Sequence, residues 1–93
     1  FTPEAARGLD LALLAVSGDF AKAHARALAA QGVAVVDNSS ALRLDPDVPL
    51  VVPEVNADAI GSHRLVANPN CTTAILVVAL EPLRRAFGLK RVI

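Results

Sequence analysis

The chain has 93 residues, of which 54% are hydrophobic and 3% aromatic, and nine basic side chains balance nine acidic ones. This length gives room for one small core, but not for a dinucleotide-binding domain together with a catalytic domain. The zero net charge indicates no surface for nucleic acid or anionic membranes, and no apolar run approaches the ~18 residues that span a bilayer. A single cysteine excludes an internal disulfide and suits a reducing cytoplasm.

The first half of the chain has the pattern of a strand–helix–strand unit. Residues 10–16 are a continuous apolar run, typical of a strand covered on both faces. A turn at 17–19 leads to an alanine-rich, helix-favouring stretch over 20–31, which Gly32 ends, and residues 33–36 predict a second buried strand. Two strands joined by one helix in so little sequence indicate parallel strands, and therefore half of a doubly wound α/β sheet.

The middle of the chain predicts a loop and a third strand. Residues 37–53 contain three prolines and are expected to form the loop, with residues 50–52 as a short extended piece. We expect Asn56 to cap a brief helical turn that Gly61 ends. Residues 64–67 then predict the third strand.

A long helix is expected to start at Cys71. It is apolar nearly all round, which predicts that it is buried, between domains or subunits. Pro82 cannot donate a hydrogen bond to the carbonyl of Val78, so we expect a kink or a break there. Gly88 should end the helix, and residues 89–93 should start another strand. The chain has no initial methionine and stops inside this expected strand, so we expect a fragment of a longer protein.

The segment with the most chemical information is Asn68-Pro69-Asn70-Cys71-Thr72-Thr73, which places the only cysteine at the start of this helix. The first turn of a helix has unpaired N–H groups and partial positive charge, which stabilise a thiolate, the nucleophilic form of cysteine. The same donors suit an oxyanion on an attacked carbonyl group. From its position alone, Cys71 could equally be a small, buried hydrophobic side chain with no chemical role.

Three loops rich in small polar residues, at Ser17, Asp37 and Asn68, each follow an expected strand. In open α/β sheets ligands bind outside the carboxyl ends of the strands, so these loops should share the functional edge. Arg43 lies in the second loop, and its guanidinium matches phosphate or carboxylate bidentately. The alternative is a surface arginine paired with a nearby aspartate, Asp45 or Asp47.

Metal binding is not indicated. His24 and His63 have no zinc-type spacing to Cys71, so we expect no metal site. Asp37, Asn38 and Ser39 are expected to fix their loop through local side-chain to backbone hydrogen bonds.

The hexapeptide at 68–73 resembles the active-site segment of the aspartate-semialdehyde dehydrogenases, in which the cysteine attacks the carbonyl carbon of the substrate. Upstream, residues 36–43 (VDNSSALR) and 47–56 (DVPLVVPEVN) are similar to two further landmark stretches of that family, in the same order. Downstream, residues 80–92 are similar to the helix and strand that follow. The resemblance covers Leu9 to Ile93.

The resemblance implies a domain organisation. Residues 1–70 would be the C-terminal part of a Rossmann-like NAD(P)-binding domain, and residues 71–93 the start of an α+β catalytic and dimerisation domain. It further implies NADP as cofactor, with NAD as the alternative, a cytoplasmic location, and a homodimer or homotetramer of the full-length protein acting on a small-molecule substrate and phosphate.

The resemblance also implies a reaction, the NADPH-dependent reductive dephosphorylation of β-aspartyl phosphate to aspartate semialdehyde, in lysine, threonine and methionine biosynthesis. Cys71 would form the acyl-thioester, and Arg43 with Asn70 would bind phosphate. Ser17 and Gly18 would approach the cofactor. The family's Ser-Ala-Gly-Gly is Ala15-Val16-Ser17-Gly18 here, and a plain tight turn is the alternative.

Two other functions stay open. N-acetyl-glutamyl-phosphate reductase uses similar chemistry, but its cysteine usually follows a glycine, where this chain has Asn70. A non-catalytic paralogue acting as a dimerising scaffold is the other, since a fold does not fix a function. The family's glycine-rich loop would precede Phe1 and its acid/base histidine would follow Ile93, so the isolated 93 residues are expected to be inactive.

Overall fold

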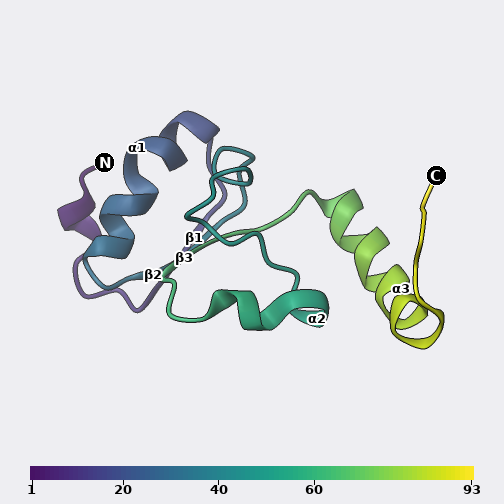
Figure 1. The fold of residues 1–93 in the computed structure, drawn as a ribbon. Helices are drawn as coiled ribbons and strands as arrows, with labels where there is room; N and C mark the ends of the chain where they lie inside the picture. The colour runs from purple at the N-terminus through teal and green to yellow at the C-terminus, as the bar shows by residue number, and fades with distance from the viewer.

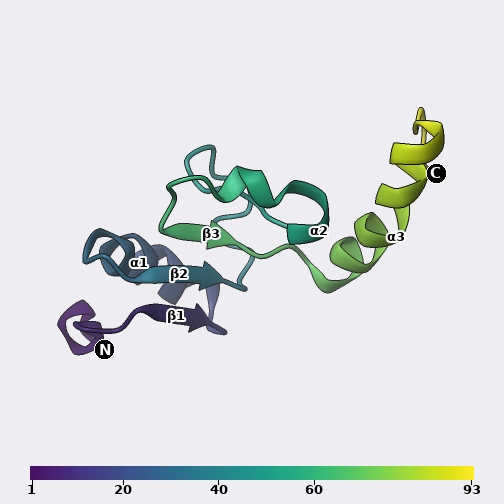
Figure 2. The ribbon, with the colours of Figure 1, turned by 90° about the horizontal axis from the view of Figure 1, so that it is seen from below.

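A computed structural model describes residues 1–93 (Figure 1). It contains one parallel three-stranded sheet in the order β1-β2-β3, which Figure 2 shows side by side. The strands are β1 (Leu11–Leu14), β2 (Ala34–Asp37) and β3 (Leu65–Ala67), and the helices are η1 (Pro3–Ala6), α1 (Gly18–Ala30), α2 (Pro53–Asn56), η2 (Ala57–Ile60) and α3 (Cys71–Phe87). The predicted parallel α/β unit is confirmed.

Helix α1 connects β1 to β2 and has clear end signals. The Ser17 hydroxyl oxygen accepts a hydrogen bond from the Phe20 amide at 3.3 Å, so the helix begins at Gly18, before the predicted Phe20. Past the other end, Gly32 has a φ of +90°, a conformation that favours glycine. The predicted end of this helix is therefore confirmed.

One face of the sheet is covered and the other is not. Side chains alternate along each strand, and the α1 side forms the core with Ala25 and Leu28 of the helix. On the opposite face Leu13 is 72% exposed and Leu11 is also exposed, so the prediction that the first strand is covered on both faces is wrong within these 93 residues.

The loop between β2 and α2 runs beside β3. Val51 donates its amide to the carbonyl of Ala67, whose own amide donates to the carbonyl of Pro49, which confirms a short extended piece here. Asn56 does not cap η2 with its side chain, contrary to the prediction. Its amide side chain instead closes the preceding turn, accepting from the Val52 amide at 2.8 Å and donating to the Leu50 carbonyl at 2.9 Å.

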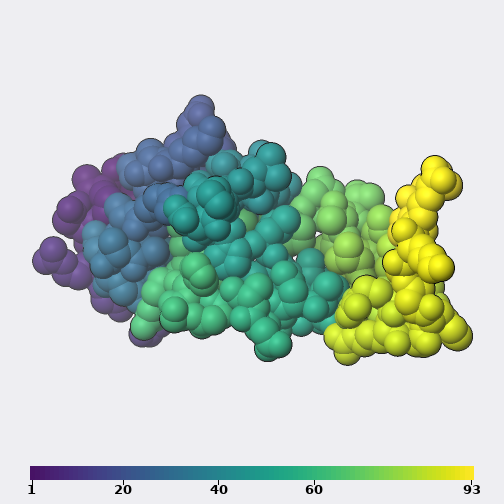
Figure 3. Space-filling view, in the orientation of Figure 1, coloured from purple at the N-terminus to yellow at the C-terminus, as the bar shows by residue number.

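Helix α3 projects away from the sheet (Figure 2). The molecule is elongated, 49 × 24 × 19 Å, and Figure 3 shows the C-terminal residues gathered at one end. Ile75 is 74% exposed and Phe87 is 84% exposed, and Glu81 is the only buried residue of the helix. The prediction of a buried helix is therefore wrong for this chain alone, because α2 is the one helix that makes an extensive contact with it and leaves most of its surface open.

The C-terminal part of α3 also departs from the sequence-based expectations. The helix continues through Pro82 without a break, although its ribbon bends in Figure 2. Gly88 ends it, as predicted, with a φ of +72°. Residues 89–93 form no strand, since no other strand lies beside them to supply hydrogen bonds. No helix of the structure has the length and apolar character needed to cross a membrane.

Candidate active site at the carboxyl edge of the sheet

The strand ends bring two asparagines together. Asn38 follows β2, and its backbone N–H donates to the carbonyl of Leu14. Asn68 follows β3, and its backbone N–H donates to the carbonyl of Asp37. The sheet ladder therefore continues one residue past each strand. It aligns the two side chains, so that Asn68 Nδ2 donates to Asn38 Oδ1 at 2.8 Å. The expected meeting of the second and third loops at one edge is confirmed.

A buried carboxylate shapes the loop after β2. Asp37 is fully buried, and its carboxylate accepts from the Ser39 amide and the Ser39 hydroxyl, both at 2.9 Å. The Ser39 hydroxyl oxygen in turn accepts from the Ala41 amide at 3.1 Å. The predicted local side-chain to backbone bonding is confirmed for Asp37 and Ser39. The loop is thereby turned so that Arg43 lies near the strand ends.

Arg43 joins the two loops that carry the asparagines. Its Nε donates to the carbonyl of Asn68 at 2.9 Å, and its Nη2 donates to the carbonyl of Asn38 at 3.1 Å. These contacts use two N–H groups of the guanidinium and leave the others for a further acceptor. The side chain is half-buried.

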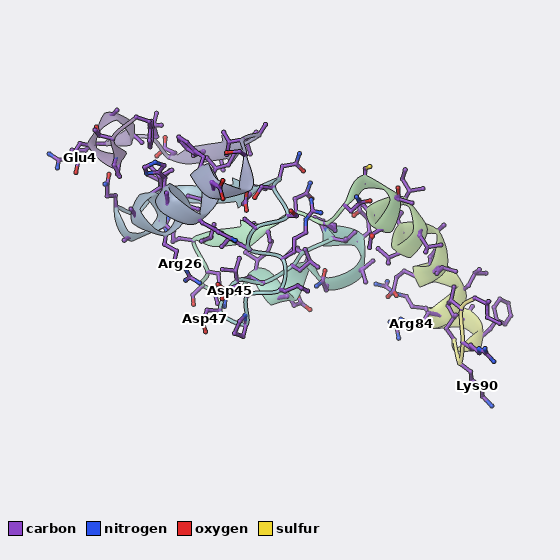
Figure 4. All side chains as sticks on the ribbon, turned by 90° about the horizontal axis from the view of Figure 1, so that it is seen from above. Glu4, Arg26, Asp45, Asp47, Arg84 and Lys90 are labelled. Carbon is purple, nitrogen blue, oxygen red and sulfur yellow. The ribbon has the colours of Figure 1, made fainter.

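The alternative of a surface ion pair at Arg43 is wrong. Asp45 is paired with Arg26 instead, at 2.6 Å, and Figure 4 shows these two residues side by side. The hydrogen bond from the Arg26 guanidinium lowers the pKa of the Asp45 carboxyl below its ordinary value. No salt bridge involves Arg43.

Cys71 is the first residue of α3 and is exposed, which excludes the small buried hydrophobe in this chain. Asn70 caps the helix, and its Oδ1 accepts from the Thr72 amide at 2.9 Å. The same oxygen lies 4.0 Å from the Cys71 sulfur. The thiol is therefore presented at a helix N-terminus, next to a polar side chain whose Nδ2 donors have no partner within the chain.

Two hollows adjoin these residues. A cavity of about 340 Å³ lies at the strand ends, with Asn38 and Asn68 at its rim and an apolar floor of Leu13, Leu14, Ala15 and Val36. A larger one, about 560 Å³, lies between α2 and α3 and is lined by Pro69 and Ile75 among other residues. No group of three or more potential metal ligands is present.

Two of the expected site residues, Ser17 and Gly18, follow β1 but do not line the hollow at the strand ends. Ser17 uses its hydroxyl oxygen to cap α1. A Cβ atom at Gly18 would lie 3.4 Å from the Ala41 Cβ, in ordinary contact. The asparagine pair is what sequence reasoning missed. The available signal was that Asn38 and Asn68 each follow a strand directly.

Comparison with known proteins shows the family to which the chain belongs. The family model described as semialdehyde dehydrogenase, NAD binding domain, matches residues 1–63. The aspartate-semialdehyde dehydrogenase of Aquifex aeolicus is 49% identical over 90 residues, which are 94% of this chain and 26% of that protein. That of Bacillus subtilis is 45% identical over 93 residues, 99% of this chain and 27% of that protein.

Solved structures give the same result. Aspartate semialdehyde dehydrogenase II of Vibrio cholerae, complexed with ASA, matches with a TM-score of 0.86 at 39% identity, over 98% of this chain and 30% of that one. The Candida albicans enzyme with NADP matches with a TM-score of 0.70 at 32% identity, over 86% and 27%. The chain spans about a quarter of the length of its curated relatives. The family model covers residues 1–63, and the match to the Bacillus subtilis relative extends over 99% of the chain, including the cysteine segment. The chain therefore belongs to the semialdehyde dehydrogenase family and is related to its aspartate-semialdehyde dehydrogenases.

Proposed function

We propose that residues 1–93 are part of an NADP-dependent aspartate-semialdehyde dehydrogenase, in which Cys71 is the nucleophile. The observation that carries this proposal is the exposed thiol at the start of α3, beside the joined loops that hold Arg43. The relatives described above support the substrate class, since each is named for aspartate semialdehyde.

The Cys71 thiolate would attack the carbonyl carbon of β-aspartyl phosphate. A sulfur–carbon bond forms and the bond between that carbon and the phosphate oxygen breaks, so phosphate leaves with the electron pair and an acyl-thioester remains on Cys71. Unpaired N–H groups in the first turn of α3 are suited to hold the oxyanion that forms during the attack. In the opposite direction phosphate attacks the thioester.

Phosphate would be bound by Arg43 and Asn70. Arg43 keeps N–H groups free after its two carbonyl contacts, and a guanidinium fork fits phosphate oxygens. Asn70 uses its oxygen for the Thr72 amide, which leaves its Nδ2 donor group available. Asn70 directly precedes Cys71, and Arg43 is hydrogen-bonded to the carbonyl of Asn68, three residues before Cys71, so both would hold the leaving phosphate close to the thioester.

The cavity at the strand ends suits the cofactor. Its apolar floor fits the face of a planar ring, and the amides at its rim offer hydrogen-bonding groups. Ser17 and Gly18, after β1, would contact the same cofactor from the neighbouring loop. When bound, the cofactor supplies the hydride that reduces the thioester to the semialdehyde. NAD is the alternative to NADP.

The wider organisation is also part of the proposal. Residues 1–70 would complete the NAD(P)-binding domain and residues 71–93 would begin the catalytic and dimerisation domain, which the projection of α3 away from the sheet supports (Figure 1). The complete enzyme would act in the cytoplasm as a homodimer or homotetramer, in lysine, threonine and methionine biosynthesis. The scaffold alternative is less well supported, since Cys71 is exposed rather than buried.

The test is NADP reduction by the complete enzyme with aspartate semialdehyde, with and without phosphate, beside Cys71→Ser. We expect phosphate-dependent reduction that falls by at least about 1,000-fold in the variant, since a hydroxyl is a far weaker nucleophile than a thiolate at neutral pH. Circular dichroism of both proteins checks that the variant is folded.

Two results would overturn the proposal. Equal activity of Cys71→Ser and the wild type would exclude the thioester. If NADP were reduced only with the N-acetylated glutamate semialdehyde, the chain would be assigned to the reductase that uses that substrate.

A further inference from the structure

Arg43 has two possible tasks, and only one of them concerns phosphate. The guanidinium donates to two backbone carbonyls, that of Asn68 in the loop after β3 and that of Asn38 in its own loop after β2. An arginine that served only as an anion ligand would need no such contacts. The carbonyl of Asn68 is two residues from Asn70 and three from Cys71, so whatever fixes Asn68 also fixes the start of α3.

The asparagine pair reinforces the same connection. Asn68 Nδ2 donates to Asn38 Oδ1 at 2.8 Å, so the two loops are joined by this side chain to side chain bond and by the bond from Arg43 to the Asn68 carbonyl. The second bond of Arg43, to the Asn38 carbonyl, fixes the arginine within its own loop. On the β2 side, Asn38 follows the buried Asp37, whose carboxylate is held by Ser39. The loop after β2 is therefore held in place by its own hydrogen bonds, and the loop after β3 leads directly to Cys71.

We propose that Arg43, Asn38 and Asn68 form a loop clamp that positions Cys71 by fixing the end of β3 against the end of β2. This proposal deepens the proposed function, since it concerns the same site, and it makes Arg43 a positioning residue as well as a phosphate ligand. Segment 68–70 is the only covalent link between the sheet and the projecting helix α3. Loosening it would let the thiol move relative to Arg43.

The clamp is tested without substrate by hydrogen exchange of the amides of residues 68–74 in the complete enzyme, in phosphate-free buffer. Arg43→Lys keeps the charge, but one ammonium group cannot span both carbonyls, and Asn38→Ala removes the acceptor for Asn68. Each is expected to raise exchange about tenfold, as the loss of one or two hydrogen bonds would. Asn38→Asp keeps an acceptor oxygen and should retain wild-type protection.

Arg26→Lys is the matched control. Arg26 also makes a hydrogen-bonded contact with a loop residue, Asp45, but that contact involves neither asparagine. We expect wild-type exchange over residues 68–74 in this variant. Unchanged exchange in both Arg43→Lys and Asn38→Ala would overturn the proposal, and so would an equal rise in Arg26→Lys.

Kinetics separate positioning from phosphate binding. Asn38→Ala is expected to lower kcat about 10- to 100-fold, as small displacements of reacting groups do, with the KM for phosphate unchanged. A raised KM with unchanged kcat would contradict the clamp. If the complete enzyme does not act on aspartate semialdehyde at all, the proposed function fails, while the exchange experiment still decides whether the clamp exists.

Discussion

Asp37 is the residue that fixes the loop from which Arg43 extends. Its carboxylate is completely buried and accepts two hydrogen bonds from Ser39, one from the backbone and one from the side chain. A buried acceptor that loses its donors is costly, and so is a donor placed against another donor. The geometry of the whole loop from Asn38 to Arg43 therefore depends on one side chain that the proposed chemistry never touches.

Asp37→Asn is expected to destabilise this loop. The variant keeps the shape but replaces one acceptor oxygen by an NH₂ group, which faces a donor of Ser39. We expect the free energy of local opening over residues 38–41 to fall by about 1–3 kcal/mol, measured by native-state hydrogen exchange of the complete enzyme. Asp47→Asn is the control, because Asp47 is exposed, and it should leave these amides unchanged. Equal exchange in the two variants would contradict the role given to Asp37.

At the scale of the elements, α1 holds the sheet through a small alanine-rich contact. Leu28 is the largest side chain that the helix contributes to the core and is only 1% exposed. The alanines beside it let the helix approach the strands closely, so little else fills the space if Leu28 is truncated. The stability of β1 and β2 therefore depends strongly on this position.

Leu28→Ala is expected to lower the free energy of opening of β1 and β2 by about 2–5 kcal/mol, the range found when a buried leucine is replaced by alanine. The measurement is hydrogen exchange of the strand amides in the complete enzyme. Leu44→Ala is a chemically identical change at a side chain that is 96% exposed, and it should change the same amides by less than about 0.5 kcal/mol. Similar effects at both positions would show that burial of Leu28 does not stabilise the sheet.

The elements also show what could be predicted from the sequence. Strands and helix ends followed from local signals. The apolar run before Ser17 indicates a strand through the burial of its side chains, and the glycines at 32 and 88 end helices through their backbone conformation. The asparagine pair could be placed at one edge of the sheet. Its hydrogen bond could not be predicted, because it depends on the register between β2 and β3, which only the folded sheet defines.

Predictions based on hydrophobicity gave the wrong result for α3. An apolar helix predicts burial but does not identify the partner, and within this chain the extensive contact of α3 is with the short helix α2. The same reason explains why Leu13 is exposed although its strand is apolar on both faces. Both apolar surfaces are consistent with the proposal that the complete enzyme has further chain to cover them, given that the relatives are about four times as long.

For the molecule as a whole, the projecting helix is attached to the body by segment 68–70 and by its contacts with α2. Glu81 lies near the second attachment: its side chain is 7% exposed and accepts from Arg84 and Arg85, one turn further along the same helix, at 2.7 Å. Arg85 also donates to the carbonyl of Glu54 in α2, at 3.4 Å. The hydrogen bonds from Arg84 and then Arg85 lower the pKa of the Glu81 carboxyl to about 2.

This pKa predicts that the stability of the C-terminal part of α3 depends on pH. The carboxyl binds its proton more weakly in the folded protein than in the unfolded chain, where its pKa is 4.5, so its contribution to stability is complete above that value and is lost as pH falls toward 2. Glu81→Gln should therefore lower the urea midpoint of the complete enzyme at pH 7, and the difference from wild type should shrink steadily as pH is lowered from 5 to 3. Glu54→Gln, which changes an exposed carboxylate of α2, should show a small difference at every pH. If the Glu81→Gln difference stayed constant between pH 7 and pH 3, the ion pairs within α3 would not stabilise the part of the helix that faces α2. The apolar side chains around the adjoining hollow of about 370 Å³, which Val55 of α2 also lines, would then account for its stability.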